Sequence, residues 1–137
     1  MRSPWVDVSV VALITTLSAC VSSPQPWCHG GERAAVADTL YFGTQEPQGV
    51  VTNEQWHGFL KDVVTPRFPR GLTVLEGSGQ WLSASGVPVH ESTHILQLVH
   101  PDDSASDALL AQVISEYRTR FAQESVLRVK VQACVTF

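Results

Sequence analysis

The order of strand-like and helix-like patterns is the feature that most constrains the fold of this chain. Four segments have the alternation or the β-branched composition of strands: 38–43, 72–75 running on towards Trp81, 90–99 and 127–137. The last alternates most regularly, because an apolar row from Leu127 to Phe137 is interleaved with a polar row that begins at Arg128. These four patterns predict a sheet.

Two helices are expected between the strands. Thr52 suits an N-cap and Gln55 completes a capping box. The apolar stripe that follows has the spacing i, i+3, i+4, i+7: Trp56, Phe59, Leu60 and Val63. Pro66 and Pro69 should end this helix. The second helix opens at residues 101–104, and its buried face should comprise Leu110, Val113, Ile114, Tyr117 and Phe121.

The resulting order βαββαβ predicts an α+β, ferredoxin-like sandwich, with two helices on one face of a four-stranded antiparallel sheet. We expect the apolar rows of the first and last strands to face the helices. These rows contain Leu40 and Phe42 in the first strand and Leu127 to Phe137 in the last. The third strand carries apolar residues on both faces, so the open face of the sheet needs cover, from the tether or from a second subunit in a homodimer.

The first twenty residues indicate export. A short apolar run, 8–17, follows Arg2 and is too short to span a bilayer, which is typical of a signal peptide. The sequence Leu-Ser-Ala-Cys ending at Cys20 resembles a bacterial lipobox, and that resemblance implies cleavage before Cys20 and acylation of its thiol. An ordinary secretory signal cleaved nearby is the alternative.

Three parts are therefore expected: a signal peptide over 1–19, a lipidated Cys20 with a Ser- and Pro-rich tether over 20–36, and one α+β domain over 37–137. Val21 follows the cysteine, where the Asp of an inner-membrane retention signal would stand. We expect palmitate-type acylation and an outer-membrane location facing the periplasm of the cell envelope. The formal net charge is −4 with no basic run, which argues against a nucleic-acid partner.

Three cysteines are present: Cys20, Cys28 and Cys134. If Cys20 is acylated, the other two form a disulfide or remain as separate thiols, and an oxidising compartment favours the disulfide. The predicted topology places Cys28, before the first strand, next to Cys134, near the end of the last. Both lines of reasoning predict a Cys28–Cys134 bridge.

The sequence HESTH at 90–94 matches the HExxH zinc motif, and His100 follows it. Zinc binding by that motif requires a helix, whereas this segment has strand composition, and residues four apart on a strand are separated by roughly 13 Å. The only methionine is Met1, so no Met-turn is possible. We therefore reject a zinc protease and expect no metal and no cofactor.

Four polar residues remain as a candidate ligand site: Arg67, Glu91, Gln123 and Glu124. Arg67 lies in a corner fixed by two prolines, and Gln123 and Glu124 lie where the second helix passes into the last strand. Arg67 could pair with Glu124 or Glu91 or bind an anion. Helix capping and a surface salt bridge are the simpler explanation.

Six short motifs occur in order: TLYFG (39–43), VTPRFP (64–69), GLTVL (71–75), GQW (79–81), RFAQESVL (120–127) and ACV (133–135). With them the chain resembles a family of bacterial envelope proteins, often with a lipobox, that is catalogued as a domain of unknown function. The resemblance implies no activity. His90 and His94 depart from the family pattern, in which basic residues flank the Glu–Ser pair.

Two functions are compatible with these features. The first is a lipid-anchored binding or accessory module that uses the open sheet face and performs no chemistry. The second is a small hydrolase or isomerase-like enzyme that uses Glu91, Arg67 and Glu124. A polar pocket joining these three side chains would favour the enzyme.

Overall fold

The computed structural model describes residues 27–47 and 49–137. The expected signal peptide, Cys20 and the first part of the tether lie outside the described residues. No helix in the described part is both long enough and apolar enough to cross a membrane.

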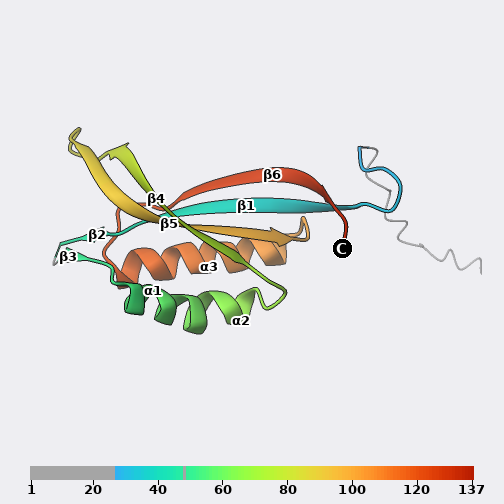
Figure 1. Ribbon diagram of the computed structural model, residues 1–137, viewed down its shortest axis with the longest axis horizontal. Coiled ribbons are helices and arrows are strands. Elements are labelled where there is room, and N and C mark those ends of the chain that lie inside the picture. Colours follow the sequence, from blue (N-terminus) through green and yellow to red (C-terminus); the bar gives the residue numbers. More distant parts are fainter. Residues whose placement is uncertain (1–26, 48) are drawn as a thin grey trace, which may run out of the picture.

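A four-stranded antiparallel sheet forms the centre of the fold. Its strands are β1 (Arg33–Gly43), β4 (Thr73–Leu82), β5 (Pro88–His100) and β6 (Leu127–Val135), in the order β4-β5-β1-β6. Figure 1 shows the helices together on one side of this sheet. The predicted ferredoxin-like α+β arrangement is confirmed. β1 begins before residue 38, inside the expected tether, because β6 continues to pair with it as far as Arg33 and Val135.

The residues between β1 and the first helix contain a small hairpin, β2 (Gln45–Glu46) and β3 (Gly49–Val50). The first helical region then runs through α1 (Asn53–Phe59), the π-helical segment η1 (Leu60–Val64) and α2 (Thr65–Arg67). Its predicted capping box is present, since Thr52 accepts from the Gln55 backbone N–H and Gln55 accepts from that of Thr52. Pro66 lies inside the last turn, and the helix ends one residue later.

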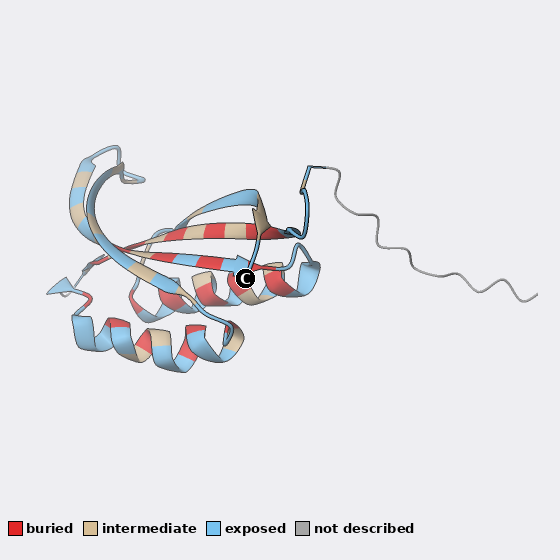
Figure 2. Ribbon diagram, turned by 45° about the vertical axis from the view of Figure 1, so that its right-hand side comes forward, coloured by how far each residue is buried: buried red, intermediate tan, exposed pale blue. Residues whose placement is uncertain are grey.

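The second helix, α3 (Ser104–Arg120), begins at the N-cap Asp103, whose side chain accepts from the Ser106 backbone N–H. The core between the helices and the sheet contains a cluster of aromatic rings: Phe42, Trp56, Phe59, Tyr117 and Phe121. Phe42 and Tyr117 meet edge to face with their ring centroids 4.6 Å apart. The buried residues lie along the surfaces where helices and sheet meet (Figure 2).

One prediction about the sheet is wrong. Leu40 and Phe42 of β1 face the helices, but the apolar row of β6 faces away from them, and Val131 is 54% exposed. The polar row of β6 takes the helix side instead, since Arg128 is paired with Leu40 across the strands. The reason is electrostatic: Asp38 is buried on the helix side of β1 and needs a cation there, which Arg128 supplies.

The predicted disulfide is present. Cys28 and Cys134 are bonded, with their Cα atoms 5.5 Å apart, and the bridge fastens the segment before β1 to the end of β6. It closes a loop between positions 106 residues apart. The predicted strand order brought these two cysteines together, and the structure has that order.

Candidate functional site

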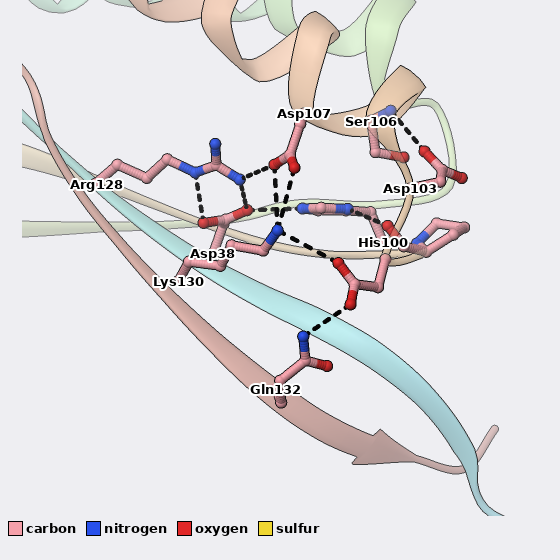
Figure 3. Close-up of polar contacts among 10 residues, drawn as sticks. Asp38, His100, Asp103, Ser106, Asp107, Arg128, Lys130 and Gln132 are labelled. Carbon is pink, nitrogen blue, oxygen red and sulfur yellow. Dashed lines mark hydrogen bonds and ion pairs between the residues drawn. The ribbon is translucent and has the colours of Figure 1, made fainter. Parts of the chain in front are cut away.

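A polar network on the helix side of the sheet is the most conspicuous cluster of charges in the described part of the chain (Figure 3). Arg128 donates to both carboxylate oxygens of Asp38, over 2.7 Å from Nε to Oδ1 and 2.6 Å from Nη2 to Oδ2. The Asp38 side chain is fully buried. Burial alone would raise its pKa, but the hydrogen bonds from Arg128 and His100 outweigh burial and hold the pKa below its usual range.

His100 completes the buried part of this network. Its Nε2 lies 2.7 Å from Oδ2 of Asp38 and its Nδ1 lies 2.7 Å from the carbonyl oxygen of Pro101. Each ring nitrogen of His100 therefore lies within hydrogen-bond distance of one oxygen. With every nitrogen of His100 and both oxygens of Asp38 engaged, no atom here is available to take up a proton from a substrate. We interpret this network as structural.

The outer part of the network ties α3 to β6. Asp107 accepts from Arg128 and from Lys130, and Lys130 also pairs with Asp102 at 3.3 Å. Gln132 donates to Asp102. The sequence analysis missed these partners, although one signal was present: Asp38 is a charged residue in a row otherwise made of Val36, Leu40 and Phe42.

The segment 90–94 is a strand, as predicted, and its histidines have separate surroundings. His94 is buried and its ring stacks on Trp56, with the centroids 4.5 Å apart. Neither of its ring nitrogens has a hydrogen-bond partner among the described residues. Burial lowers the pKa of His94, although Glu76, whose carboxylate oxygen lies 3.9 Å from Nδ1, works against that shift.

Glu91, from the same strand, lies on the other side of the sheet. The register pairs it with Gly79 of β4, in the row that includes Thr93 and Ile95 and faces away from the helices. Its Oε2 accepts from the backbone N–H of Gln45 at 2.9 Å. Oε1 has no hydrogen-bond partner in the described part of the chain. The carboxylate is therefore held at one oxygen and open at the other.

Gly43 makes room for this carboxylate. A Cβ atom built on Gly43 would lie 2.6 Å from Oε1 of Glu91, so any larger residue would push the carboxylate aside. The carbonyl oxygen of Gly43 accepts from the Tyr117 hydroxyl at 2.8 Å. Burial, followed by the charges of Glu91 and Glu46, raises the pKa of Tyr117, which keeps the phenol protonated as a donor.

The Glu91 carboxylate belongs to a pocket of about 200 Å³ on the open face. We call this cavity the Glu91 pocket; besides Glu91, it is lined by Tyr41, Gly43, Gly79, Gln80, Trp81, Thr93, Gln123, Ser125 and Leu127. Two aromatic side chains thus accompany one charged group. The β4–β5 hairpin, which rises from the sheet on the side away from the helices, supplies Gln80 and Trp81 (Figure 1).

Gln123 reaches the pocket because of how α3 ends. Ala122 has the left-handed φ of 48°, and the Gln123 backbone N–H bonds to the carbonyl oxygen of Arg118, as in a Schellman-type cap. The Gln123 side-chain amide donates to the carbonyl oxygens of Gln45, at 2.5 Å, and Phe121. Gln123 therefore links the helix end to the loop that positions Glu91.

The structure brings two of the four sequence-predicted site residues together, Glu91 and Gln123. Arg67 lies on the helix side, where it donates to the carbonyl oxygen of Val63 at 2.7 Å and to Gln112. Glu124 accepts from the Ala84 backbone N–H in the β4–β5 turn at 3.3 Å. Since Glu91 faces away from the helices, the sheet separates it from Arg67. Sequence spacing could not reveal which face each would occupy.

One group of possible metal ligands converges in the described residues: Cys28, Glu32 and Cys134. The two sulfurs are bonded to each other, so neither is a thiolate that could bind an ion. The Glu91 pocket has a single carboxylate among its lining side chains. Its chemistry is that of one carboxylate with aromatic neighbours.

The fold and this pocket define a small ferredoxin-like α+β protein with a carboxylate site on its open sheet face. The chain belongs to the family described as "Protein of unknown function (DUF3574)", whose model matches residues 37–137. No curated protein matches it.

Two solved structures are similar. A phage SAM lyase in complex with S-methyl-5′-thioadenosine has a TM-score of 0.60 at 15% identity, covering 80% of this chain and 93% of the lyase. A phage SAM lyase in the apo state has a TM-score of 0.49 at 20% identity, covering 79% and 92%. At these identities the first likeness shows a shared fold. It corrects the expectation of a binding module without chemistry, because an enzyme uses this fold.

Proposed function

We propose that this protein is a small-molecule enzyme of the lyase or isomerase type, in which Glu91 accepts a proton from the substrate. The observation that carries the proposal is the half-engaged carboxylate: Oε2 is fixed by the Gln45 N–H, while Oε1 has no partner among the described residues. A base needs such an open oxygen within reach of its substrate. Asp38, whose two oxygens are both engaged, lacks one.

The lining of the pocket supports a substrate with positive charge and a flat or apolar group. Tyr41 and Trp81 offer aromatic surface, which attracts cations as well as rings, and Glu91 supplies the negative charge. The fold shared with the phage SAM lyase, an enzyme of this type, makes S-adenosylmethionine the first compound to test. Its sulfonium is cationic and its adenine is a flat ring.

The size of the pocket limits how such a substrate could bind. Sites for ligands of drug size usually enclose about 300–1,000 Å³, whereas the Glu91 pocket has about 200 Å³. One end of the molecule would enter, and the rest would lie outside the pocket. In a lyase reaction Glu91 would take a proton from carbon, the C–H electron pair would form the new double bond, and the thioether would leave with the C–S electrons.

The test incubates the purified protein with S-adenosylmethionine and follows the release of S-methyl-5′-thioadenosine by chromatography. Glu91→Gln should lower turnover at least about 100-fold, since general-base catalysis contributes roughly 10²–10⁴. Gly43→Ala, which displaces the carboxylate without removing it, should also impair turnover. Arg67→Ala, on the other side of the sheet, is the control and should keep the wild-type rate.

Two results would contradict the proposal. Turnover by Glu91→Gln at the wild-type rate would exclude Glu91 as the base. If the wild type neither binds nor converts S-adenosylmethionine, that compound is excluded as the substrate. Absence of binding by other small cations and nucleosides in calorimetry would then exclude the pocket as a binding site for this class of ligand.

We also propose that the protein acts in the cell envelope, anchored through lipid at Cys20. The signal-like run and the lipobox-like sequence support this location, and the disulfide fits an oxidising compartment. Labelled palmitate should enter the wild type in a bacterial host and should not enter Cys20→Ser. Unlabelled wild-type protein with a free Cys20 thiol would refute the anchor.

A further inference from the structure

The open face of the sheet is long, apolar and almost free of charge between its two ends. Alternation places five exposed aliphatic side chains on it: Leu75, Val99, Leu127, Val129 and Val131. Soluble monomers rarely expose a contiguous apolar patch of more than a few hundred Å². Figure 1 shows the helices on the opposite side, so no element of the described chain covers this face.

Opposite charges occupy the two ends of the face. Glu91 lies at the end formed by the β4–β5 hairpin. At the other end, a groove of about 810 Å³ runs over β5 between Arg33 and Arg70, and it has no acidic side chain in its lining. Arg33 lies over the Phe137 ring, 5.5 Å from its centroid, and in the described part of the chain neither arginine has an ion pair.

We propose that a second copy of this chain covers the open face, with its strands antiparallel to those of the first. When the strands of the two copies are aligned, two-fold symmetry allows two face-to-face arrangements. If the axis runs along the strands, the Glu91 ends meet each other and the arginine ends meet each other. If the axis lies across the strands, Glu91 on β5 of each copy faces the groove over β5 of the other, between the partner's Arg33 and the partner's Arg70.

The charges favour the second arrangement, because it brings unlike ends together, whereas the first places like charges against each other, where they repel. The area is sufficient. Four strands of about ten residues cover roughly 600 Å² in projection, and side chains enlarge this towards the ~800 Å² that each partner contributes to a standard interface. The rising β4–β5 hairpin of each copy would then lie against the end of its partner.

This arrangement would also complete the Glu91 pocket, a consequence that rests on the proposed function. The partner's Arg33 and the partner's Arg70 would lie over a pocket that is small and open in one chain. They would supply the positive charge that the Glu91 pocket itself lacks. A substrate between them could carry an anionic group as well as the group that reacts at Glu91.

The test is sedimentation of the full chain carrying Cys20→Ser, which removes the acylation site. We expect a dimer, with twice the mass of one chain. Val131→Lys, halfway along the edge strand β6 on this face, should weaken association at least tenfold. Glu91→Arg alone should weaken association to a similar extent, and so should the double variant Arg33→Glu with Arg70→Glu. The triple variant that combines these three substitutions exchanges the charges of the two ends and should restore association. Glu54→Arg, on exposed α1, is the control and should have no effect.

Three outcomes would overturn the inference. The wild type could be a monomer, Val131→Lys could leave the dimer unchanged, or the triple variant could associate as weakly as the single and double variants from which it is built. Circular dichroism of each variant separates lost association from lost folding. A dimer that meets all these expectations but has no turnover would count against the proposed function alone. Full turnover by a Val131→Lys monomer would exclude the partner's arginines from the site.

Discussion

Asp38 and Glu91 are two carboxylates on opposite sides of one sheet, and they differ in how completely they are paired. Asp38 lies under the helices with both oxygens bound, by Arg128 and His100. Glu91 lies on the open face with one oxygen held by a backbone N–H. The comparison separates two kinds of carboxylate: the buried Asp38 is saturated by its partners, whereas Glu91 in its pocket keeps one oxygen open to a ligand.

The strongest test of this comparison is the removal of the Asp38 carboxylate. Asp38→Ala leaves Arg128 without its buried counter-charge and His100 without its hydrogen-bond partner, and breaking a buried ion pair in this way costs about 3–5 kcal/mol. Thermal denaturation should show a fall in Tm of more than about 10 °C. Asp102→Ala, which removes an exposed carboxylate of the same network, is the matched control and should change Tm little. Equal effects of the two variants would refute the structural role of Asp38.

Removing the disulfide tests how much it stabilises the sheet edge formed by β6, where Cys134 lies. The bridge joins residues 106 positions apart, for which the chain-entropy model gives at most about 4–5 kcal/mol and measured effects are usually smaller. Cys134→Ser should lower the free energy of unfolding in urea by about 2–4 kcal/mol while circular dichroism keeps the native spectrum. A loss of native structure would mean that the bridge is needed to form the sheet edge.

The pH dependence distinguishes the buried groups of the helix side. Because burial lowers the pKa of His94, the unfolded chain takes up a proton below about pH 6.5 that the folded chain resists. Stability should therefore fall as the pH decreases through this region, with at most about 1.4 kcal/mol per pH unit from this residue. The lowered pKa of Asp38 acts in the same direction, but only below about pH 4.

His94→Phe keeps a ring against Trp56 and should reduce the dependence of the free energy of unfolding on pH between pH 6.5 and 5. His57→Gln, which removes an exposed histidine near His94, should leave the slope largely intact. Denaturant titrations at each pH measure both variants. An unchanged slope for His94→Phe would show that this histidine does not govern the acid response.

The smallest expected effect on stability is that of Glu91→Gln. The glutamine oxygen can still accept from the Gln45 N–H, so the free energy of unfolding should change by less than about 1 kcal/mol. Combined with the loss of turnover expected above, this would separate the reactive carboxylate from the structural one. A destabilisation as large as that of Asp38→Ala would contradict the comparison.

The sequence alone determined most of the architecture, because hydrophobic period and turn chemistry are local. The alternation of β1 and β6, the Thr52 capping box and the helix opened at residues 101–104 predicted the ferredoxin-like order. That order in turn placed Cys28 beside Cys134. The strand composition of 90–94 also proved stronger evidence than its match to a zinc motif.

Only the tertiary structure decided which row of β6 faces the helices. Local pattern placed Leu127 and Val129 inward, but the buried charge of Asp38 required Arg128 there, and pairing that charge outweighs burying a few valines. The same inversion left an apolar row on the open face. The tertiary structure also determined which residues form the site, because the face that a strand residue occupies depends on its partners across the sheet. Glu91 and Gln123 line the same pocket on the open face, whereas Arg67 lies on the helix side.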